Sequence, residues 1–302
     1  MLTPRRNPTL AADGVLLGVT FVWGATFVVI SDTLGTTSPF AFLSLRFGVA
    51  TLLCLPFLPA FRHGVRRCEA SDGLLLGALL ALGFGLQTVG LVEISPSRSA
   101  FLTSMYVVFT PLLALPLLGR APSLPTMAGV ACSLAGLAMM SWDGGGFATR
   151  RGDWLTLACA VAFALQIILL DRATRRGDFR RLFVVQIAAA ALFLTPGLAL
   201  ETVRFEWSAH LAMAIILTAG PATVGAFYLQ SRFQPQTTPN RAAILFASEP
   251  VFAALTTALV RGESGLTGRG WVGAALILAG VVVAEIRRPA ALSGGPASES
   301  GD

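Results

Sequence analysis

Ten apolar stretches, separated by short gaps that hold most of the charged residues, dominate this 302-residue chain. Each approaches the ~17–25 residues that an α-helix needs to cross the hydrocarbon core of a bilayer. Strands of a membrane β-barrel would instead appear as ~10-residue segments of alternating polarity. The pattern therefore predicts an all-α membrane protein with ten transmembrane helices. The expected spans lie near residues 13–32, 39–60, 72–92, 98–118, 124–142, 153–171, 181–200, 208–230, 239–260 and 268–286.

The small share of charged residues points the same way. Only 13% of the residues are charged and the mean hydropathy is +0.72, whereas a soluble domain carries roughly 25% charged residues to cover its surface. Lipid must therefore cover much of this surface. We expect a multi-pass protein of the inner (plasma) membrane, with the lipid bilayer as its surroundings.

The arginines set the expected orientation. All 22 basic residues are arginine, and arginines collect in the gaps that face the cytoplasm. With the N-terminus in the cytoplasm, fifteen arginines fall in inside gaps, six fall in outside gaps and Arg46 lies within a span. This bias accounts for the +6 net charge and predicts cytoplasmic N- and C-termini. We expect no binding of nucleic acid, because no basic face interleaved with aromatic residues is present.

The two halves of the sequence resemble one another. The segment AGVACSLAGLAMM (128–140) aligns with VGAALILAGVVVA (272–284), each with two glycines seven residues apart, and Asp13 precedes the first span as Asp153 precedes the sixth. Because five spans per half is an odd number, the second half must run the opposite way, as in the inverted repeats of secondary transporters. The expected organisation is a cytoplasmic N-terminal segment (1–12), a first five-helix repeat (13–142), a periplasmic connector (143–152), a second five-helix repeat (153–286) and a disordered cytoplasmic tail (287–302).

Short motifs in several spans carry a family resemblance. The first span contains Trp23-Gly24-Ala25-Thr26-Phe27 and the second contains Leu45-Arg46-Phe47. Further motifs are FGLQTVGL (84–91), AFLTSMYVVFTPLLA (100–114), YLQSRFQ (228–234) and RAAILFASEPVFAAL (241–255). In these motifs the chain resembles the drug/metabolite transporter superfamily, specifically its ten-span EamA-type members, over about residues 13–286. Arg120 departs from the family pattern, which usually has a glutamate there.

The resemblance implies a function without fixing the solute. Members of the superfamily move small metabolites by alternating access, often as exporters and commonly with a proton or solute gradient. We therefore expect a secondary transporter for a small-molecule solute such as an amino acid. A broad-specificity drug or toxin exporter is the main alternative, and an intramembrane enzyme or a structural membrane protein is a remote one. The oligomeric state is left open, with a homodimer as one option.

Two ionisable residues lie deep within the expected spans. Arg46 is about eight residues, or ~12 Å, from the outer end of its span, and Glu249 is about ten residues, or ~15 Å, from the inner end of its own. A charge at this depth costs at least ~2.5–3.5 kcal/mol, so each should face a cavity or a partner. Both are expected in the substrate path, Arg46 to attract a carboxylate and Glu249 to bind a cationic group or carry a proton. The alternative is a structural ion pair between the halves.

Polar side chains at similar depths extend this candidate substrate site. Amide and hydroxyl groups within a span hydrogen-bond either a solute or a neighbouring helix, so both interpretations stay open. Proline favours a kink, and two of the prolines within spans are candidate hinges, with static bends as the alternative. The polar candidates are Trp23, Thr26, Gln87, Tyr106, Gln166, Gln186 and Tyr228, and the candidate hinges are Pro111 and Pro250.

The sequence lacks the motifs of several kinds of catalysis and of metal binding. No Walker A motif or GxSxG nucleophile motif occurs, so the chain offers no pattern for nucleotide hydrolysis or acyl transfer. The two histidines, His63 and His210, stand at span ends, and no CxxC or HExxH spacing could hold a metal. We expect no enzyme activity, no cofactor, no metal and no disulfide.

Overall fold

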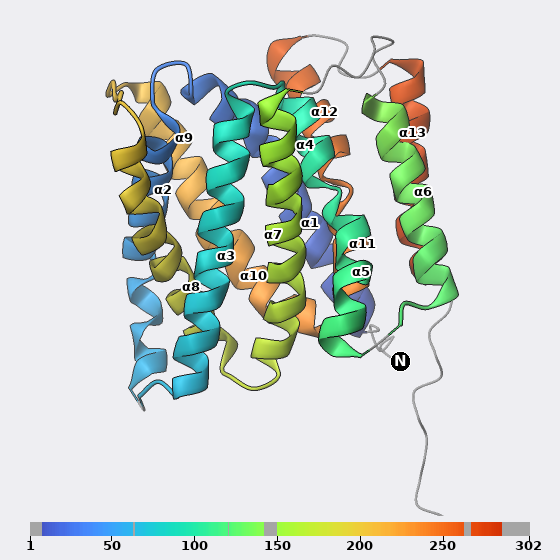
Figure 1. Cartoon of the computed structure of the whole chain (residues 1–302), viewed down its shortest axis with the longest axis horizontal. Helices are drawn as coiled ribbons and strands as arrows, with labels where there is room; N and C mark the ends of the chain where they lie inside the picture. The colour runs from blue at the N-terminus through green and yellow to red at the C-terminus, as the bar shows by residue number, and fades with distance from the viewer. Residues whose placement is uncertain (1–7, 63, 120, 142–149, 263–266, 286–302) are drawn as a thin grey trace, which may run out of the picture.

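Prolines, capping residues and glycines divide the chain into α-helices connected by short turns (Figure 1). The structure is a computed structural model, and it describes residues 8–62, 64–119, 121–141, 150–262 and 267–285. No strand occurs in these ranges. The α-helices are α1 (Pro8–Thr33), α2 (Pro39–Leu53), α3 (Arg67–Leu91), α4 (Pro96–Thr103), α5 (Tyr106–Leu118), α6 (Leu124–Ser141), α7 (Arg151–Thr174), α8 (Phe179–Leu194), α9 (Ala209–Ala219), α10 (Ala226–Phe233), α11 (Pro239–Phe246), α12 (Glu249–Arg261) and α13 (Gly268–Glu285).

Shorter helical segments continue several of these helices. The 3₁₀ segments are η1 (Leu55–Phe61), η2 (Thr195–Leu200) and η4 (Gln234–Gln236), and η3 (Gly220–Gly225) is a π-helical segment between α9 and α10. The expected N-terminal segment, connector and tail fall in large part on residues 1–7, 142–149 and 286–302, which lie outside the described residues.

The all-helical membrane class is confirmed. Seven helical segments are long and apolar enough to cross a bilayer, and eight if α2 and η1, which meet at 57°, form one bent span. The apolar parts of α6 and α13 are shorter, at residues 124–140 and 268–284. At 1.5 Å per residue each of these reaches about 25 Å, a little less than the ~30 Å hydrocarbon core. Length and composition alone therefore do not establish the expected ten spans.

Two of the expected spans are broken at matched places. The helix axis is interrupted at Ser104 and Met105 between α4 and α5, and at Ala247 and Ser248 between α11 and α12. Each break follows a helix of eight residues and precedes a helix of thirteen. Pro250 occupies the first turn of α12, where proline is tolerated, beside the second break.

Pro111 occupies a different position. It lies inside α5, beyond the break of its own span. The interruption of this span is therefore at Ser104 and Met105 and not at the proline, and hinge motion at either proline stays a prediction.

Helices α6 and α13 pack against each other through glycines. A Cβ atom added to Gly129 would lie 2.8 Å from the carbonyl oxygen of Gly280, and one added to Gly280 would lie 2.7 Å from that of Gly129. Gly136 and Gly273 face each other in the same way. Only glycine permits such a close approach of two backbones. The first glycine of each aligned pair therefore contacts the second glycine of the other half, because α6 and α13 are antiparallel (Figure 1).

Reciprocal ion pairs join the two halves at opposite ends of the bundle. We call the end at which α1 begins the N-terminal face, and the end at which α1 ends the distal face. At the N-terminal face Arg241 of α11 pairs with Asp13 of α1. At the distal face Arg98 of α4 pairs with Asp153 of α7, with N–O distances of 2.6 and 2.8 Å. Arg98 and Arg241 each occupy the third position of their helix, so each half supplies the arginine at one face and the aspartate at the other.

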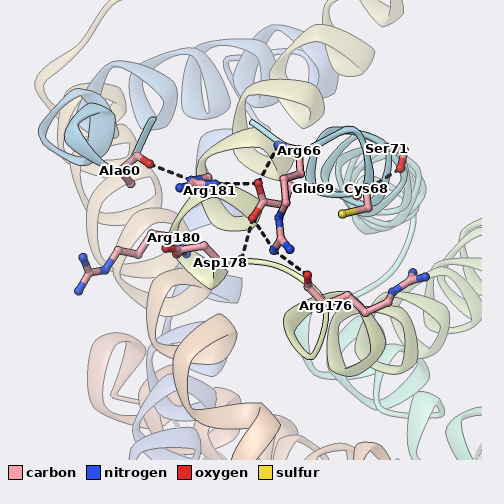
Figure 2. A network of polar contacts seen from close by, with 9 residues as sticks. All are labelled: Ala60, Arg66, Cys68, Glu69, Ser71, Arg176, Asp178, Arg180 and Arg181. Carbon is pink, nitrogen blue, oxygen red and sulfur yellow. Dashed lines mark hydrogen bonds and ion pairs between the residues drawn. The ribbon is translucent and has the colours of Figure 1, made fainter. Parts of the chain in front are cut away.

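Glu69 forms the centre of a polar network at the N-terminal face, which Figure 2 shows. Its carboxylate is fully buried and accepts hydrogen bonds from the backbone N–H and guanidinium of Arg66, from the N–H of Asp178 and from Arg181. The guanidinium of Arg181 also donates to the carbonyl of Ala60, at 2.8 Å. The hydrogen bond to Glu69 raises the pKa of Arg66. The network ties the start of α3 to the start of α8, across the two halves.

Glu201 occupies a comparable place at the distal face. It follows η2 and accepts hydrogen bonds from the Ser38 hydroxyl at 2.6 Å and from the N–H groups of Phe40 and Ala41 at 3.1 and 3.0 Å. Ser38 is the N-cap of α2, and Phe40 and Ala41 belong to its first turn, whose N–H groups have no partner within the helix. Glu69 and Glu201 thus each hold the start of the second span of the opposite half.

Candidate functional site

A cavity of about 50 Å³ lies between the two halves, near the middle of the bundle. This is room for a few water molecules, since one water needs roughly 10–15 Å³ on the same measure. Its walls come from α1, α2, α3, α4, α5, α7, α10, α11 and α12. The lining residues are Trp23, Thr26, Phe27, Ile30, Arg46, Phe84, Gln87, Thr103, Tyr106, Phe163, Gln166, Ile167, Phe227, Gln230, Phe246 and Glu249.

Most of the lining comes in matched pairs from the two halves. The pairs from α1 and α7 share one separation along the sequence, and the pairs from the later helices share another, slightly longer one. Arg46 and Ile30 differ, because the residues that match them at the first separation, Gln186 and Leu170, do not line the cavity. The pairs are Trp23 with Phe163, Thr26 with Gln166, Phe27 with Ile167, Phe84 with Phe227, Gln87 with Gln230, Thr103 with Phe246, and Tyr106 with Glu249.

Arg46 places a buried positive charge at the cavity. Its side chain comes from the middle of α2 and is 1% exposed. Its Nε donates to the Thr223 hydroxyl at 2.9 Å, and its guanidinium lies over the Phe84 ring at 4.6 Å. Within the part of the chain that the structure describes, no carboxylate forms an ion pair with Arg46. A guanidinium held by a hydroxyl and two aromatic rings keeps its Nη groups available to an anion.

Glu249 places a buried carboxyl group at the same cavity. It begins α12, directly after the break in that span, and is 6% exposed. Tyr106 donates its hydroxyl hydrogen to this carboxyl group at 3.2 Å. The helix N-terminus favours an acidic group there. Among the described residues no cation forms an ion pair with Glu249, so Arg46 and Glu249 are not paired with each other in this structure.

The amide side chains at the cavity retain unused hydrogen-bonding capacity. Gln87 donates to the Thr103 hydroxyl at 3.0 Å, and Gln230 donates to the side chains of Gln166 and Gln234. The Nε2 of Gln166 and the Oε1 of Gln230 are buried without a protein hydrogen-bond partner. Buried polar atoms normally have partners, so these two atoms are groups that a solute or water would satisfy.

Trp23 turns its indole toward the interior of the bundle. Its Nε1 donates to the carbonyl of Ala222 at 3.0 Å, across the boundary between the halves. Its ring packs against Phe227 and Phe246, each with a centroid separation of 5.3 Å. These rings provide an apolar, aromatic part of the cavity wall.

Seven of the nine polar residues expected from the sequence line the cavity. Gln186 and Tyr228 lie elsewhere. Gln186 donates to the Ser231 hydroxyl at 3.2 Å, linking α8 to α10. Tyr228 packs in an aromatic cluster beside Phe57 and Phe183. Contact of any of the nine with a solute stays a prediction.

Sequence reasoning missed the apolar part of the lining. Phe84, Phe163 and Phe227 look like ordinary lipid-facing or core residues in an apolar span. Alignment of the two halves through their third and eighth spans would have found Phe227 and Gln230 from FGLQ (84–87), since residues 226–230 read AFYLQ. Thr223, the partner of Arg46, was also missed, because its role depends on a π-helical segment.

Metal-binding groupings are absent from the described ranges. No cluster of three or more His, Cys, Asp or Glu side chains lies there. The cysteines Cys54, Cys68, Cys132 and Cys159 are free, and two of them, Cys54 and Cys159, are buried.

Three comparisons with known proteins bear on the family and on the fold. The model of the EamA-like transporter family matches residues 10–142 and again residues 150–285. An uncharacterized transporter of Archaeoglobus fulgidus is 32% identical over 278 residues, which are 92% of this chain and 87% of that protein. A solved crystal structure has a TM-score of 0.76 over 91% of this chain and 98% of its own, and at 20% identity this likeness concerns the fold alone. The resemblance drawn from the sequence motifs is confirmed.

Proposed function

The chain belongs to the EamA-like transporter family, within the drug/metabolite transporter superfamily, and is a multi-pass membrane transporter; we propose that it is a secondary transporter for a zwitterionic metabolite such as an amino acid. The proposed direction is export across the inner (plasma) membrane. Its substrate site is the central cavity between the halves. Nucleotide hydrolysis and catalysis play no part in this proposal, and a homodimer stays an untested prediction.

One observation carries the choice of substrate. Arg46 and Glu249 line a single cavity, both buried and neither paired with an opposite charge among the described residues. A buried charge is costly unless a partner compensates it. A zwitterion supplies both partners at once, with its carboxylate at Arg46 and its ammonium group at Glu249. The aromatic wall around Trp23 suits an apolar side chain.

The reciprocal contacts support an alternating-access mechanism. The proposed arrangement has ten spans, counting α6 and α13, in an inverted five-plus-five repeat. Both termini of the chain face the cytoplasm in this arrangement. The Asp13–Arg241 pair closes one face and the Arg98–Asp153 pair closes the other. Because the cavity of about 50 Å³ is too small for a metabolite, the halves must separate at one face to admit it. Because the contacts at the two faces match, opening at either face would break equivalent contacts, with the roles of the two halves exchanged.

Glu249 is the proposed coupling residue. A buried carboxyl group without a cationic partner is neutralised by a proton or by the ammonium group of the substrate. Exchange between the two would link substrate movement to a proton gradient. The Tyr106 hydroxyl, at 3.2 Å, holds the carboxyl group in place during this exchange.

Transport in proteoliposomes tests the proposal. Counterflow is measured with a panel of neutral, acidic and basic L-amino acids, with and without a pH gradient. Arg46→Gln and Glu249→Gln are each expected to lower the flux of neutral amino acids at least tenfold, because each removes one charge-assisted contact worth roughly 1.5–3 kcal/mol. Gln186→Leu, at the position matched to Arg46 but outside the cavity, is the control and should retain flux.

Two results would count against this function. Full flux in the well-folded Arg46→Gln and Glu249→Gln variants would remove both residues from the substrate path. Flux that ignores every imposed pH gradient would leave the zwitterion site standing but exclude proton coupling through Glu249.

A drug exporter is the second candidate, because the cavity wall holds Trp23 and several phenylalanine rings. Aromatic rings attract lipophilic cations, and such cations would use Glu249 without Arg46. Export of tetraphenylphosphonium by wild type and by Arg46→Gln, but not by Glu249→Gln, would favour this alternative over an amino acid carrier.

A further inference from the structure

The π-helical segment η3 interrupts the span formed by α9 and α10, beside the cavity. It covers six residues with the sequence GPATVG and contains Pro221, which lacks an N–H. A π-helical turn shifts the backbone register and is found frequently at functional sites. Here the shifted turn presents two consecutive residues, Ala222 and Thr223, to the opposite half of the protein.

Both of these residues contact side chains of the proposed substrate site. The carbonyl of Ala222 accepts the indole N–H of Trp23 at 3.0 Å. The hydroxyl of Thr223 accepts the Nε–H of Arg46 at 2.9 Å. The two contacts reach from the second half of the chain to α1 and α2 of the first half. Neither Ala222 nor Thr223 lines the cavity.

The hydroxyl of Thr223 has a fixed direction. It is fully buried and donates its own hydrogen to the carbonyl of Thr218 at 2.7 Å, five residues earlier. With the donor used, only its lone pairs remain, and one of them accepts from Arg46. A hydroxyl that was free to rotate could also turn its hydrogen toward Arg46, which has no lone pair to accept it. The hydrogen bond within the π-helical segment therefore leaves the Thr223 hydroxyl able only to accept a hydrogen bond from Arg46.

The contact restricts the orientation of the guanidinium group. A hydrogen bond at Nε lies in the guanidinium plane, and the Cζ atom lies over the Phe84 ring, 4.6 Å from its centroid. Together these contacts limit the rotation of the group. The two Nη groups then point away from Thr223, in the fork geometry that binds a carboxylate through two hydrogen bonds.

We propose that Thr223 is a positioning residue that aims the Arg46 guanidinium at the substrate carboxylate. The identity of the anion as a substrate carboxylate rests on the proposed function. The orientation of Arg46 does not depend on that function. Loss of the hydroxyl leaves the charge in place and frees its rotation. Binding of a carboxylate then weakens, while binding of a compound without a carboxylate does not.

The test uses three threonine variants of the full chain. Thr223→Val removes the hydroxyl with little change of shape, and Thr223→Ser restores it. Thr20→Val is the matched control, because the Thr20 hydroxyl is also fully buried and donates to its own helix, at Leu16, but does not contact Arg46.

The first measurement follows Arg46 without any substrate. In protein labelled with ¹⁵N-arginine, the Nε–H signal that Arg46→Lys removes is assigned to Arg46. Thr223→Val is expected to shift this signal and to speed its hydrogen exchange at least tenfold. Thr223→Ser and Thr20→Val should leave it as in wild type. An unchanged Arg46 signal in folded Thr223→Val would overturn the proposal.

The second measurement compares L-leucine counterflow with inhibition by 3-methylbutylamine, which is leucine without its carboxylate. Thr223→Val should raise the KM for leucine about tenfold with kcat little changed, and should alter inhibition by the amine less than twofold. Thr223→Ser should restore the KM. A wild-type KM in Thr223→Val, or an equal loss for both compounds, would overturn the positioning role. Absence of leucine flux in wild type would count against the proposed function, and the Arg46 signal would then decide the orientation by itself.

Discussion

The two faces of the bundle are closed by similar contacts made from different chemistry. At each face an aspartate from the first span of one half pairs with an arginine from the fourth span of the other half. Each face also has a glutamate from one half that binds the start of the second span of the other half. At the N-terminal face this glutamate, Glu69, is fully buried and binds two arginines. At the distal face Glu201 binds a hydroxyl and two backbone N–H groups instead.

This difference predicts unequal strength. A buried carboxylate bound by guanidinium groups is costly to break, since each separated charge then lacks a partner. A helix cap leaves no unpaired cation behind when it breaks. The N-terminal face should therefore stay closed more firmly than the distal face, and substitutions at the two faces should reveal the difference.

The largest effect is expected from the two glutamates. Glu69→Gln leaves Arg181 without a carboxylate and should lower the free energy of unfolding by about 2 kcal/mol, or the melting temperature in detergent by about 5 °C. Glu201→Gln should cost about 0.5–1 kcal/mol, because the amide oxygen still accepts from α2. Thermal unfolding of both variants measures this. Cys68, next to Glu69, provides a second readout, since its labelling by a maleimide should rise in Glu69→Gln only. Equal losses in the two variants would contradict the proposed asymmetry.

A moderate effect is expected from the aspartates of the reciprocal pairs. Asp153→Asn weakens the distal face and Asp13→Asn weakens the N-terminal face. The aspartates of both pairs are buried, but an asparagine oxygen still accepts from the arginine, so each loss should be about 0.5–1 kcal/mol. A single cysteine at position 26 in the cavity, with the four native cysteines replaced, reports which face is open. Labelling by an impermeant maleimide from the distal side should rise about threefold in Asp153→Asn and fall in Asp13→Asn. A shift in the same direction for both would refute their opposite roles.

The smallest effect is expected from the exposed pairs between α3 and the ends of α7. Arg176 lies 3.1 Å from Asp72 at the N-terminal face, and Arg151 lies 4.0 Å from Glu93 at the distal face. Water and salt screen such pairs. Arg176→Gln and Arg151→Gln should each change the free energy of unfolding by less than about 0.5 kcal/mol. A loss well above that, about 1 kcal/mol or more, would place that pair among the contacts that hold its face closed.

Charge and hydropathy in the sequence predicted the fold class and the centre of the candidate site. Arg46 and Glu249 stood out because an ionisable group is rare in an apolar span, and both line the cavity. Glu69 did not stand out, because a glutamate among arginines in a gap looks like a solvated charge. Its burial depends on Asp178 and Arg181, which belong to the other half of the chain, and such tertiary contacts leave no local signal.

The local sequence also does not predict where the helices break. Prolines suggested where the spans bend, and Pro250 does lie beside a break, but the matching break at Ser104 and Met105 contains no proline. The π-helical turn at Thr223 contains a Gly-Pro pair, which predicts an irregularity but not the direction of a hydroxyl. Gln186 and Tyr228 were chosen for depth alone, and depth does not say which side of a helix faces the cavity.

The contact between Tyr106 and Glu249 depends on a difference in sequence between the two halves. These residues occupy matched positions and contact each other, so they lie where the two halves meet. In a pair of identical chains related by a two-fold axis, a residue at such a place faces its own copy. Two ionised glutamates would then repel, whereas two tyrosines would not. A single acid that faces a tyrosine is therefore possible only where the two halves differ in sequence at this place, as they do in this chain.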